Sequence, residues 1–249
     1  MNAPAAWLLD AGNSRIKCAC LRADGTRDAV SAYAHDDPAA VRALLDRLRG
    51  GLPAEAWLAS VAPAAATAFL EVALAEAGLR LHRVRTEAQR GRLRIAYADP
   101  SNLGVDRFLG LLAASERGDG ACLLVSAGTA LTVDLLDADG QHLGGLIAPM
   151  PAMMRSALAG IAQLAVGDGR RHDFATDTAD AIASGCEGAA LGLVERSLRL
   201  ATVRLGGEPT VLLTGGGADM LKDLAAARVV IEPTLVLDGL SMLALGASE

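Results

Sequence analysis

The sequence builds one local pattern twice, and this repeat restricts the fold more than any other feature. The first copy reads LLDAGNSRIKCACLRADG and the second VSAGTALTVDLLDADG. Each copy predicts an apolar strand, a turn containing Gly and a hydroxyl residue, a second strand of alternating polarity, and an Asp-Gly hairpin. A chain that repeats such a unit is expected to form two related α/β domains that face each other.

The elements predicted after each copy support this division. A third strand follows each Asp-Gly hairpin, and helices then alternate with strands through the rest of each half. Helices are expected at 38–49, 64–77, 107–114, 153–164, 179–199 and 237–245, with further strands at 56–61, 79–84, 211–214 and near Val229. A polar segment at 115–120 separates the halves, so we predict an N-terminal domain of residues 1–117 and a C-terminal domain of residues 118–249.

Composition narrows the class of protein. At 249 residues, with 52% hydrophobic and 21% charged residues, the chain can fill two modest cores and does not have the composition of a disordered protein. The net charge of -6 and the lack of a basic run with interleaved aromatic residues argue against a nucleic-acid partner. We expect no signal peptide or membrane span, hence a cytoplasmic protein. The four cysteines show no metal-binding spacing and are expected to be reduced thiols.

The two Gly-containing turns are suited to binding phosphate. Two strands joined by a tight turn expose several backbone N–H groups at one end of a sheet, and these form a concave donor cluster for an anion. Gly12, Asn13, Ser14 and Lys17 supply this environment in the first copy, as Gly128, Thr129 and Thr132 do in the second. Either turn alone is also an ordinary hairpin. Two copies, together with a Thr-Gly-Gly-Gly turn after a later strand, predict binding of a nucleotide phosphate chain.

Asp10 ends an apolar strand, where a carboxylate needs a cation, a hydrogen-bond donor or water. A hydrated Mg²⁺ bound to a nucleotide would meet this need. The second copy has Ser126 at the corresponding place, so the two turns differ in charge.

Five motifs together resemble the type III pantothenate kinases, members of the acetate kinase, sugar kinase and actin superfamily. The resemblance covers nearly the whole chain and rests on DAGNSRIK, YADPSNLGVDR, AGTALTVD followed by GGLIAP, DTADAIASG, and LLTGGG. It implies two ribonuclease H-like (actin-like ATPase) α/β domains with a cleft between them. It also implies a homodimeric enzyme that phosphorylates pantothenate with ATP, the first step toward coenzyme A.

The resemblance also assigns site residues. Asp106 would be the proton acceptor, and Asp10 would hold Mg²⁺, through water. The residues implied to bind ATP are Asp10, Ala11, Gly12, Asn13, Ser14, Arg15, Ile16, Lys17, Gly128 and Thr129. The residues implied to bind pantothenate are Tyr97, Gly104, Val105, Asp106, Arg107 and Thr178.

These roles agree with the chemistry of phosphoryl transfer, which needs a positioned hydroxyl, a group to take its proton, and cations across the migrating charge. Asp106 follows a Gly-containing bend and Arg107 could hold the carboxylate of pantothenate. The alternative is that Asp106 only complements a helix dipole, with Arg107 solvated. Likewise, Tyr97 could be a core or edge residue of a strand, and Thr178 a helix cap.

The chain departs from the family at two positions. Many members have Asp where this chain has Ser126, and that Asp is associated with a monovalent cation, K⁺ or NH4⁺, so the dependence on such an ion stays open. Met150 occupies a position where the family often has Gly. A non-catalytic regulatory homologue and a kinase with another small-molecule acceptor therefore remain alternatives. The four histidines are expected to be surface or structural residues. Asp134 and Asp137 could form a cation site in the second domain, but strand-end carboxylates beside a hairpin are usually solvated, and solvation is the expectation here.

Overall fold

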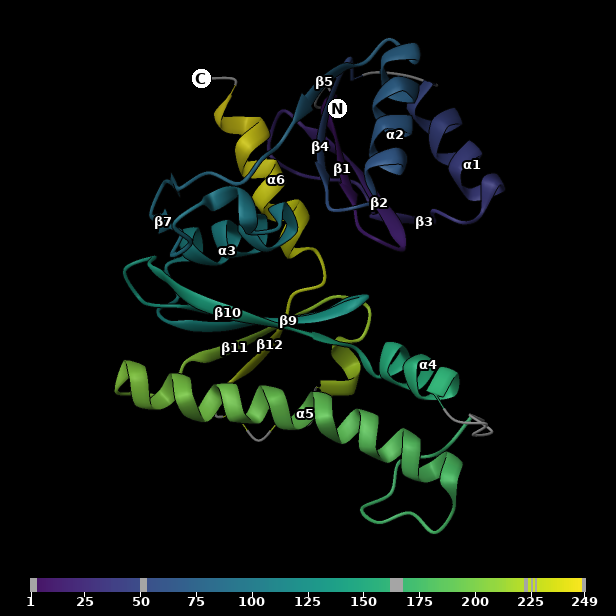
Figure 1. Cartoon of the computed structure of the whole chain (residues 1–249). Helices are drawn as coiled ribbons and strands as arrows, with labels where there is room; N and C mark the ends of the chain where they lie inside the picture. The colour runs from purple at the N-terminus through teal and green to yellow at the C-terminus, as the bar shows by residue number, and fades with distance from the viewer. Residues whose placement is uncertain are drawn as a thin grey trace. The chain divides into compact units, whose positions relative to one another are not determined.

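The computed structural model describes residues 4–49, 53–161, 168–221, 224, 226 and 228–247, and it is an α/β structure. The chain divides into two compact units (Figure 1). The first comprises Met1–Arg117 together with Thr234–Glu249, and the second comprises Gly118–Pro233. Among the described residues, every helix is too short or too polar to cross a membrane.

The first unit is built on a five-stranded sheet of order β3-β2-β1-β4-β5. Its strands are β1 (Pro4–Ala11), β2 (Arg15–Arg22), β3 (Ser31–Ala34), β4 (Glu55–Ser60) and β5 (Arg80–Arg83). The three N-terminal strands form an antiparallel meander, and β4 pairs in parallel with β1. The helices are α1 (Pro38–Arg49), α2 (Ala64–Glu76), α3 (Val105–Arg117) and α6 (Leu235–Gly246). A small β6–β7 hairpin (Gln89–Arg90, Leu93–Arg94) and a 3-10 turn (Pro100–Asn102) precede α3.

The alternation of side chains along β1 directs Asp10 toward α3 and α6. Trp7, Leu9 and Ala11 share a core with leucines of α1 and α2. Because successive side chains of a strand point to opposite faces, Leu8 and Asp10 face the other side of the sheet. Figure 1 shows α1 and α2 on one side of this sheet and α6 with α3 on the other. Asp10 is therefore held at the end of β1 on the α3 side.

Helix α6 belongs to the first unit although it ends the chain, whereas the division predicted at 117/118 placed it in the C-terminal domain. It packs along α3 so closely that a Cβ atom on Gly239 would lie 2.2 Å from the carbonyl oxygen of Leu109. Asp238 of α6 forms ion pairs with Arg27 and with Arg117, the latter at 3.7 Å. These contacts hold the last segment of the chain on the first unit.

The second unit repeats the architecture with a sheet of order β10-β9-β8-β11-β12. Its elements are β8 (Cys122–Ala127), β9 (Ala130–Leu136), β10 (His142–Pro149), α4 (Pro151–Ile161), α5 (Thr178–Leu205), β11 (Thr210–Thr214), a second 3-10 turn (Ala218–Leu221) and β12 (Val229–Ile231). Leu123, Val125 and Val133 of the sheet share a core with Ala190 and Val194 of α5. Helix α5 runs along this face of the sheet (Figure 1).

Most predicted elements are present, with shifts at their ends. The third strand predicted after the first Asp-Gly hairpin is β3, which begins only at Ser31, and helix α5 extends to Leu205. Helix α3 begins at Val105, two residues before the predicted start. The predicted end of the helix at 153–164 lies partly outside the described residues.

Candidate functional site

The turn between β1 and β2 closes tightly and presents its central residues to solvent. The N–H group of Gly12 donates a hydrogen bond to the carbonyl oxygen of Arg15 at 3.0 Å. Asn13, Ser14 and Arg15 are exposed. Ala11 and Ile16 pair with each other across the hairpin and are buried in the core, so any contact they make with a ligand uses their backbone.

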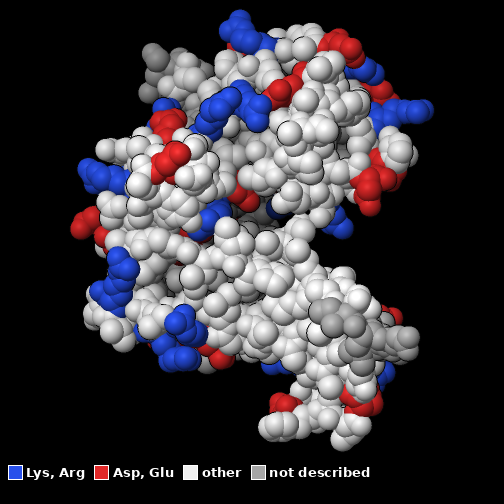
Figure 2. Space-filling view, viewed as in Figure 1, with Lys and Arg blue, Asp and Glu red and all other residues white. Residues whose placement is uncertain are grey.

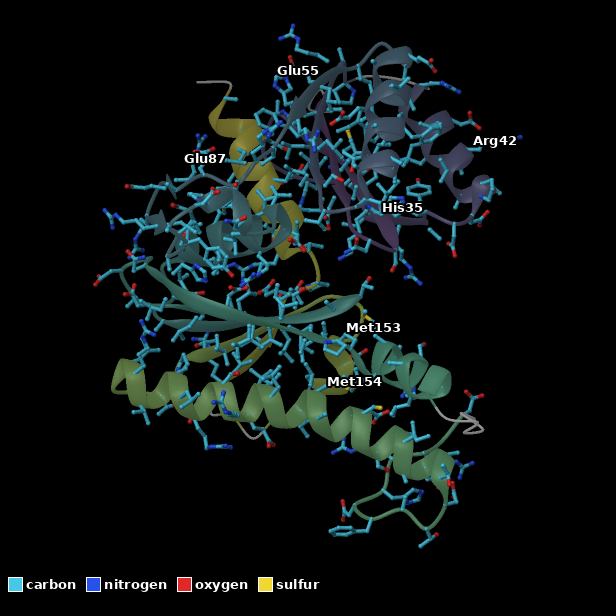
Figure 3. All side chains as sticks on the ribbon, viewed as in Figure 1. His35, Arg42, Glu55, Glu87, Met153 and Met154 are labelled. Carbon is cyan, nitrogen blue, oxygen red and sulfur yellow. The ribbon has the colours of Figure 1, made fainter. Side chains whose placement is uncertain are left out.

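His35 contacts the same turn, which the sequence did not indicate. Its ring atom Nε2 lies 2.8 Å from the carbonyl oxygen of Gly12, and its backbone N–H donates to the carbonyl oxygen of Ser14 at 3.1 Å. Figure 3 labels this residue just beyond the end of β3. The expectation of a surface or structural histidine says nothing about this contact, because the contact depends on how β3 pairs with β2.

Asp10 is a buried carboxylic acid, with only 8% of its surface exposed. Burial raises the pKa of Asp10 to about 6, while the positive charge of Lys17, its partner across the hairpin, lowers it. The negative charge of Asp106 raises this pKa further. The ionised form of Asp10 is therefore costly in the free protein, and a cation beside it would remove part of this cost.

Asp106 lies in the first turn of α3 and is half-buried. Its Oδ1 atom accepts a hydrogen bond of 2.8 Å from the backbone N–H of Arg107. Gly104 leaves room for this carboxylate, because a Cβ atom at that position would lie 2.6 Å from Oδ1 of Asp106. The side chain thus has the position of a helix N-terminal carboxylate and also lies near Asp10.

Arg107 is buried, which excludes the alternative in which it is a solvated side chain. Its Nη1 atom donates a hydrogen bond of 3.2 Å to the hydroxyl of Tyr97, and the guanidinium lies 5.8 Å from the centre of the Tyr97 ring. Tyr97 itself lies in the segment between β7 and the 3-10 turn rather than in a strand. The positively charged guanidinium of Arg107 is therefore held in place by Tyr97 within the first unit.

In the second unit, the β8–β9 turn and the Thr-Gly-Gly-Gly turn lie together. Strands β8 and β11 run parallel, with Ser126 in register with Thr214, so the turns follow at the same edge of the sheet. The N–H group of Gly217 donates to the carbonyl oxygen of Ala127 at 2.9 Å. Gly215 has φ of +90°, and a Cβ atom there would lie 2.4 Å from the same oxygen. Gly128 and Thr129 are exposed beside this junction.

Met150, one of the departures from the family pattern, is buried in the core of the second unit. Its Cε atom would lie 2.8 Å from a Cβ atom on Gly217. The larger side chain therefore fills space beneath the glycine turn.

Thr178 is the first residue of α5 and lines an open groove of about 870 Å³ in the second unit. The groove is lined mainly by apolar side chains of α4 and α5, among them Met154, Leu158, Ala181 and Ile182. The helix cap is Asp177, whose carboxylate accepts a hydrogen bond from the N–H of Asp180 at 3.0 Å. The capping role suggested for Thr178 is therefore wrong, and its side chain is exposed at the groove.

Asp134 and His142 form a buried pair, with Nε2 of His142 lying 3.0 Å from Oδ1 of Asp134. The expectation that Asp134 is solvated is wrong. Asp137 accepts hydrogen bonds from the N–H groups of Asp139 and Gln141 and so closes the hairpin. No group of three or more acidic, histidine or cysteine side chains within the described residues is arranged to hold a metal ion by itself.

Two α/β units with this strand order have the fold of the actin-like ATPases and sugar kinases. A Sinorhizobium meliloti protein provisionally assigned as 2-dehydro-3-deoxygalactonokinase aligns with a TM-score of 0.63 and 17% identity, covering 97% of this chain and 99% of that one. An archaeal actin homologue aligns with a TM-score of 0.50 and 12% identity over 96% of this chain and 99% of its own. These likenesses establish the fold.

Sequence comparison is more specific. A family model described as type III pantothenate kinase matches residues 7–199. The type III pantothenate kinase of Stenotrophomonas maltophilia strain K279a is 47% identical over 236 residues, which cover 94% of this chain and 95% of that protein. The chain belongs to the type III pantothenate kinase family.

Proposed function

We propose that the protein transfers the γ-phosphoryl group of ATP to the primary hydroxyl of pantothenate, giving 4'-phosphopantothenate for coenzyme A synthesis. The observation that carries the proposal is the match to the family over nearly the whole chain, with 47% identity to a relative named for this activity. The proximity of Asp10 and Asp106 within the first unit supports it, because phosphoryl transfer uses one carboxylate to hold the metal ion that binds the phosphates and another to take the proton of the acceptor hydroxyl.

Asp106 is proposed as the group that takes the proton of the acceptor hydroxyl. As the new oxygen–phosphorus bond forms, the bond between the γ-phosphorus and the bridging oxygen breaks and ADP leaves with its electron pair. A carboxylate hydrogen-bonded to the N–H of Arg107 is held in one orientation for this step. The room left by Gly104 permits that orientation.

Asp10 is proposed to hold Mg²⁺ through water. The fit rests on its burial and its raised pKa, which mark an anion whose charge is poorly compensated in the free protein. With no three-residue metal cage among the described residues, a cation here would take most of its ligands from water and phosphate. Such an ion would neutralise charge on the phosphate oxygens. The exposed turn from Gly12 to Arg15, with Lys17, is proposed to bind the phosphates, as are Gly128 and Thr129 of the second unit.

Arg107 and Tyr97 are proposed to bind the carboxylate of pantothenate. A buried guanidinium already held by a hydroxyl and an aromatic ring loses little entropy when it pairs with an anion. Thr178 is proposed to contact pantothenate at the rim of the apolar groove, which would suit the methyl groups of the substrate. Gly104 and Val105 of the first unit are also proposed to bind pantothenate.

A homodimer is proposed from the apolar surface around α4. Ile147, Met153 and Leu158 are 66%, 47% and 37% exposed. Figure 3 places Met153 and Met154 on α4, and Figure 2 shows few charges on the visible surface around this helix, while charges of both signs are interspersed elsewhere. Sedimentation of the wild type and of Met153→Glu over a range of concentrations tests this assembly. We also propose a cytoplasmic location.

The activity is tested by incubating the purified protein with ATP, Mg²⁺ and pantothenate and detecting phosphopantothenate by mass spectrometry. We expect stoichiometric ADP and phosphopantothenate. Phosphorylation of a sugar or of acetate in place of pantothenate would instead support a kinase with another acceptor. Absence of transfer to every acceptor would support the regulatory alternative.

A further inference from the structure

His35 reaches the β1–β2 turn because of the pairing between β2 and β3. The two strands are antiparallel, with Arg15 opposite Ala34, so the residue that follows β3 lies beside the residues that precede β2. His35 is half-buried there and makes two hydrogen bonds to the turn, one from its ring and one from its backbone. His35, twenty-three positions after Gly12, therefore contacts both ends of the Asn13-Ser14 loop.

The ring contact fixes the orientation of one peptide group. A trans peptide is planar, and its carbonyl and N–H groups point in opposite directions. Since the carbonyl of Gly12 points at Nε2 of His35, the N–H of Asn13 points away from the histidine. The backbone bond from His35 to the carbonyl of Ser14 fixes the other side of the loop. The loop is thus held in one conformation before any ligand binds.

We propose that His35 is a positioning residue for nucleotide binding, which acts by directing the N–H of Asn13 toward the phosphate chain of ATP. This inference rests on the proposed function of the turn. The ring must donate from Nε2, since the carbonyl oxygen of Gly12 can only accept, and both the neutral Nε2–H tautomer and the imidazolium do so. His35 itself does not touch the substrate, and its effect reaches the phosphates through the backbone of Gly12 and Asn13.

The experiment compares three substitutions of His35. His35→Gln places an amide nitrogen near the position of Nε2, whereas His35→Asn places its amide nearer Nδ1 and His35→Ala offers no donor. The matched control is His82→Ala in the same unit, where the histidine stacks on Trp57 and pairs with Glu55. For each variant, kcat and the KM values for MgATP and pantothenate are measured, and thermal melting checks folding.

Loss of one hydrogen bond predicts that His35→Ala and His35→Asn raise the KM for MgATP about 3- to 10-fold, with the KM for pantothenate changed less than about 2-fold. His35→Gln should stay within about 2-fold of the wild type for both substrates. His82→Ala should leave both KM values unchanged.

Equal KM values for MgATP in the wild type and His35→Ala would overturn the inference, as would parallel increases in both KM values that Gln does not relieve. Should His35→Ala fail to fold, the Gln and Asn variants give the same comparison. A wild-type protein that phosphorylates pantothenate while His35→Ala is unaffected refutes only the role of His35. A wild-type protein without any kinase activity refutes the proposed function instead.

Discussion

The carboxyl groups of Asp10 and Asp106 interact electrostatically within the first unit, although the two residues lie 96 positions apart in the chain. Burial raises the pKa of Asp10 to about 6, Lys17 lowers it, and Asp106 raises it again. The last strand residues of β1 and the first turn of α3 are therefore parts of one acidic site.

Asp10 should destabilise the free protein at neutral pH. The native state binds a proton on Asp10 up to a pH of about 6, whereas the unfolded chain releases it near the ordinary pKa of an aspartate, 3.8. Stability therefore falls as pH rises through this window, by a total on the order of 3 kcal/mol. Asp10→Asn removes this loss, so its stability relative to the wild type should be similar at pH 4 and greater above pH 6. Urea denaturation of both proteins without nucleotide or Mg²⁺ measures the difference. If the difference in unfolding free energy between the two proteins did not change with pH, the raised pKa of Asp10 would be contradicted.

Asp106→Asn should fold normally and lose turnover by a factor of about 10² to 10⁴, the usual contribution of a general base. The amide can still accept the hydrogen bond from the N–H of Arg107, so the helix start is preserved. Steady-state kinetics give the loss, and Asp46→Asn on the exposed face of α1 is the matched control. Full activity of Asp106→Asn would show that another group accepts the proton.

Gly12 and Gly215 should respond differently to alanine. A Cβ atom on Gly12 would lie 3.4 Å from the carbonyl oxygen of Arg15, an ordinary contact, so Gly12→Ala should fold and lose affinity for ATP. Gly215 combines φ of +90° with a backbone clash at Ala127, and Gly215→Ala should lose about 1–3 kcal/mol of stability. Thermal melting and ATP titration separate the two effects, with Gly207→Ala as a control. A destabilised Gly12→Ala protein with unchanged ATP affinity would contradict this assignment.

Asp177 and Thr178 are adjacent, yet their substitutions should affect different properties. Asp177→Ala removes the cap of α5 and should cost about 1 kcal/mol of stability. Thr178→Ala should leave stability unchanged and raise the KM for pantothenate, because this side chain lines the groove and is not the cap. Denaturation and kinetics on the same preparations test both. If Thr178→Ala lowered stability and left the KM for pantothenate unchanged, Thr178 would have a structural role instead.

Ser126 should weaken the dependence on a monovalent cation, since a hydroxyl offers an oxygen ligand without charge. We expect similar turnover in potassium, ammonium and sodium salts at equal ionic strength. Ser126→Asp should introduce a preference among these ions. Strong activation of the wild type by potassium alone would mean that other oxygen atoms hold the ion.

The sequence predicted the features that depend on neighbours along the chain. The two hairpins and the Gly-containing turns follow from local turn chemistry and alternating polarity, and they are present as expected. Features set by pairing between distant segments were not predicted. His35 meets Gly12 through the register of β2 and β3, and Asp134 is buried because it meets His142 across β9 and β10. The start of α5 was misjudged by one residue, since Asp177 and Thr178 are both good caps.

The position of α6 has a consequence for how the protein is made. Because Thr234–Glu249 packs with Met1–Arg117, the N-terminal unit remains incomplete until residues 234–249 have been synthesised, after the whole of the second unit. A fragment that stops at residue 117 would present to water the face of α3 that Gly239 and its neighbours cover. Separating the two units as independent proteins therefore requires a fused fragment that joins 234–249 to 1–117, and a single cut in the chain cannot achieve it.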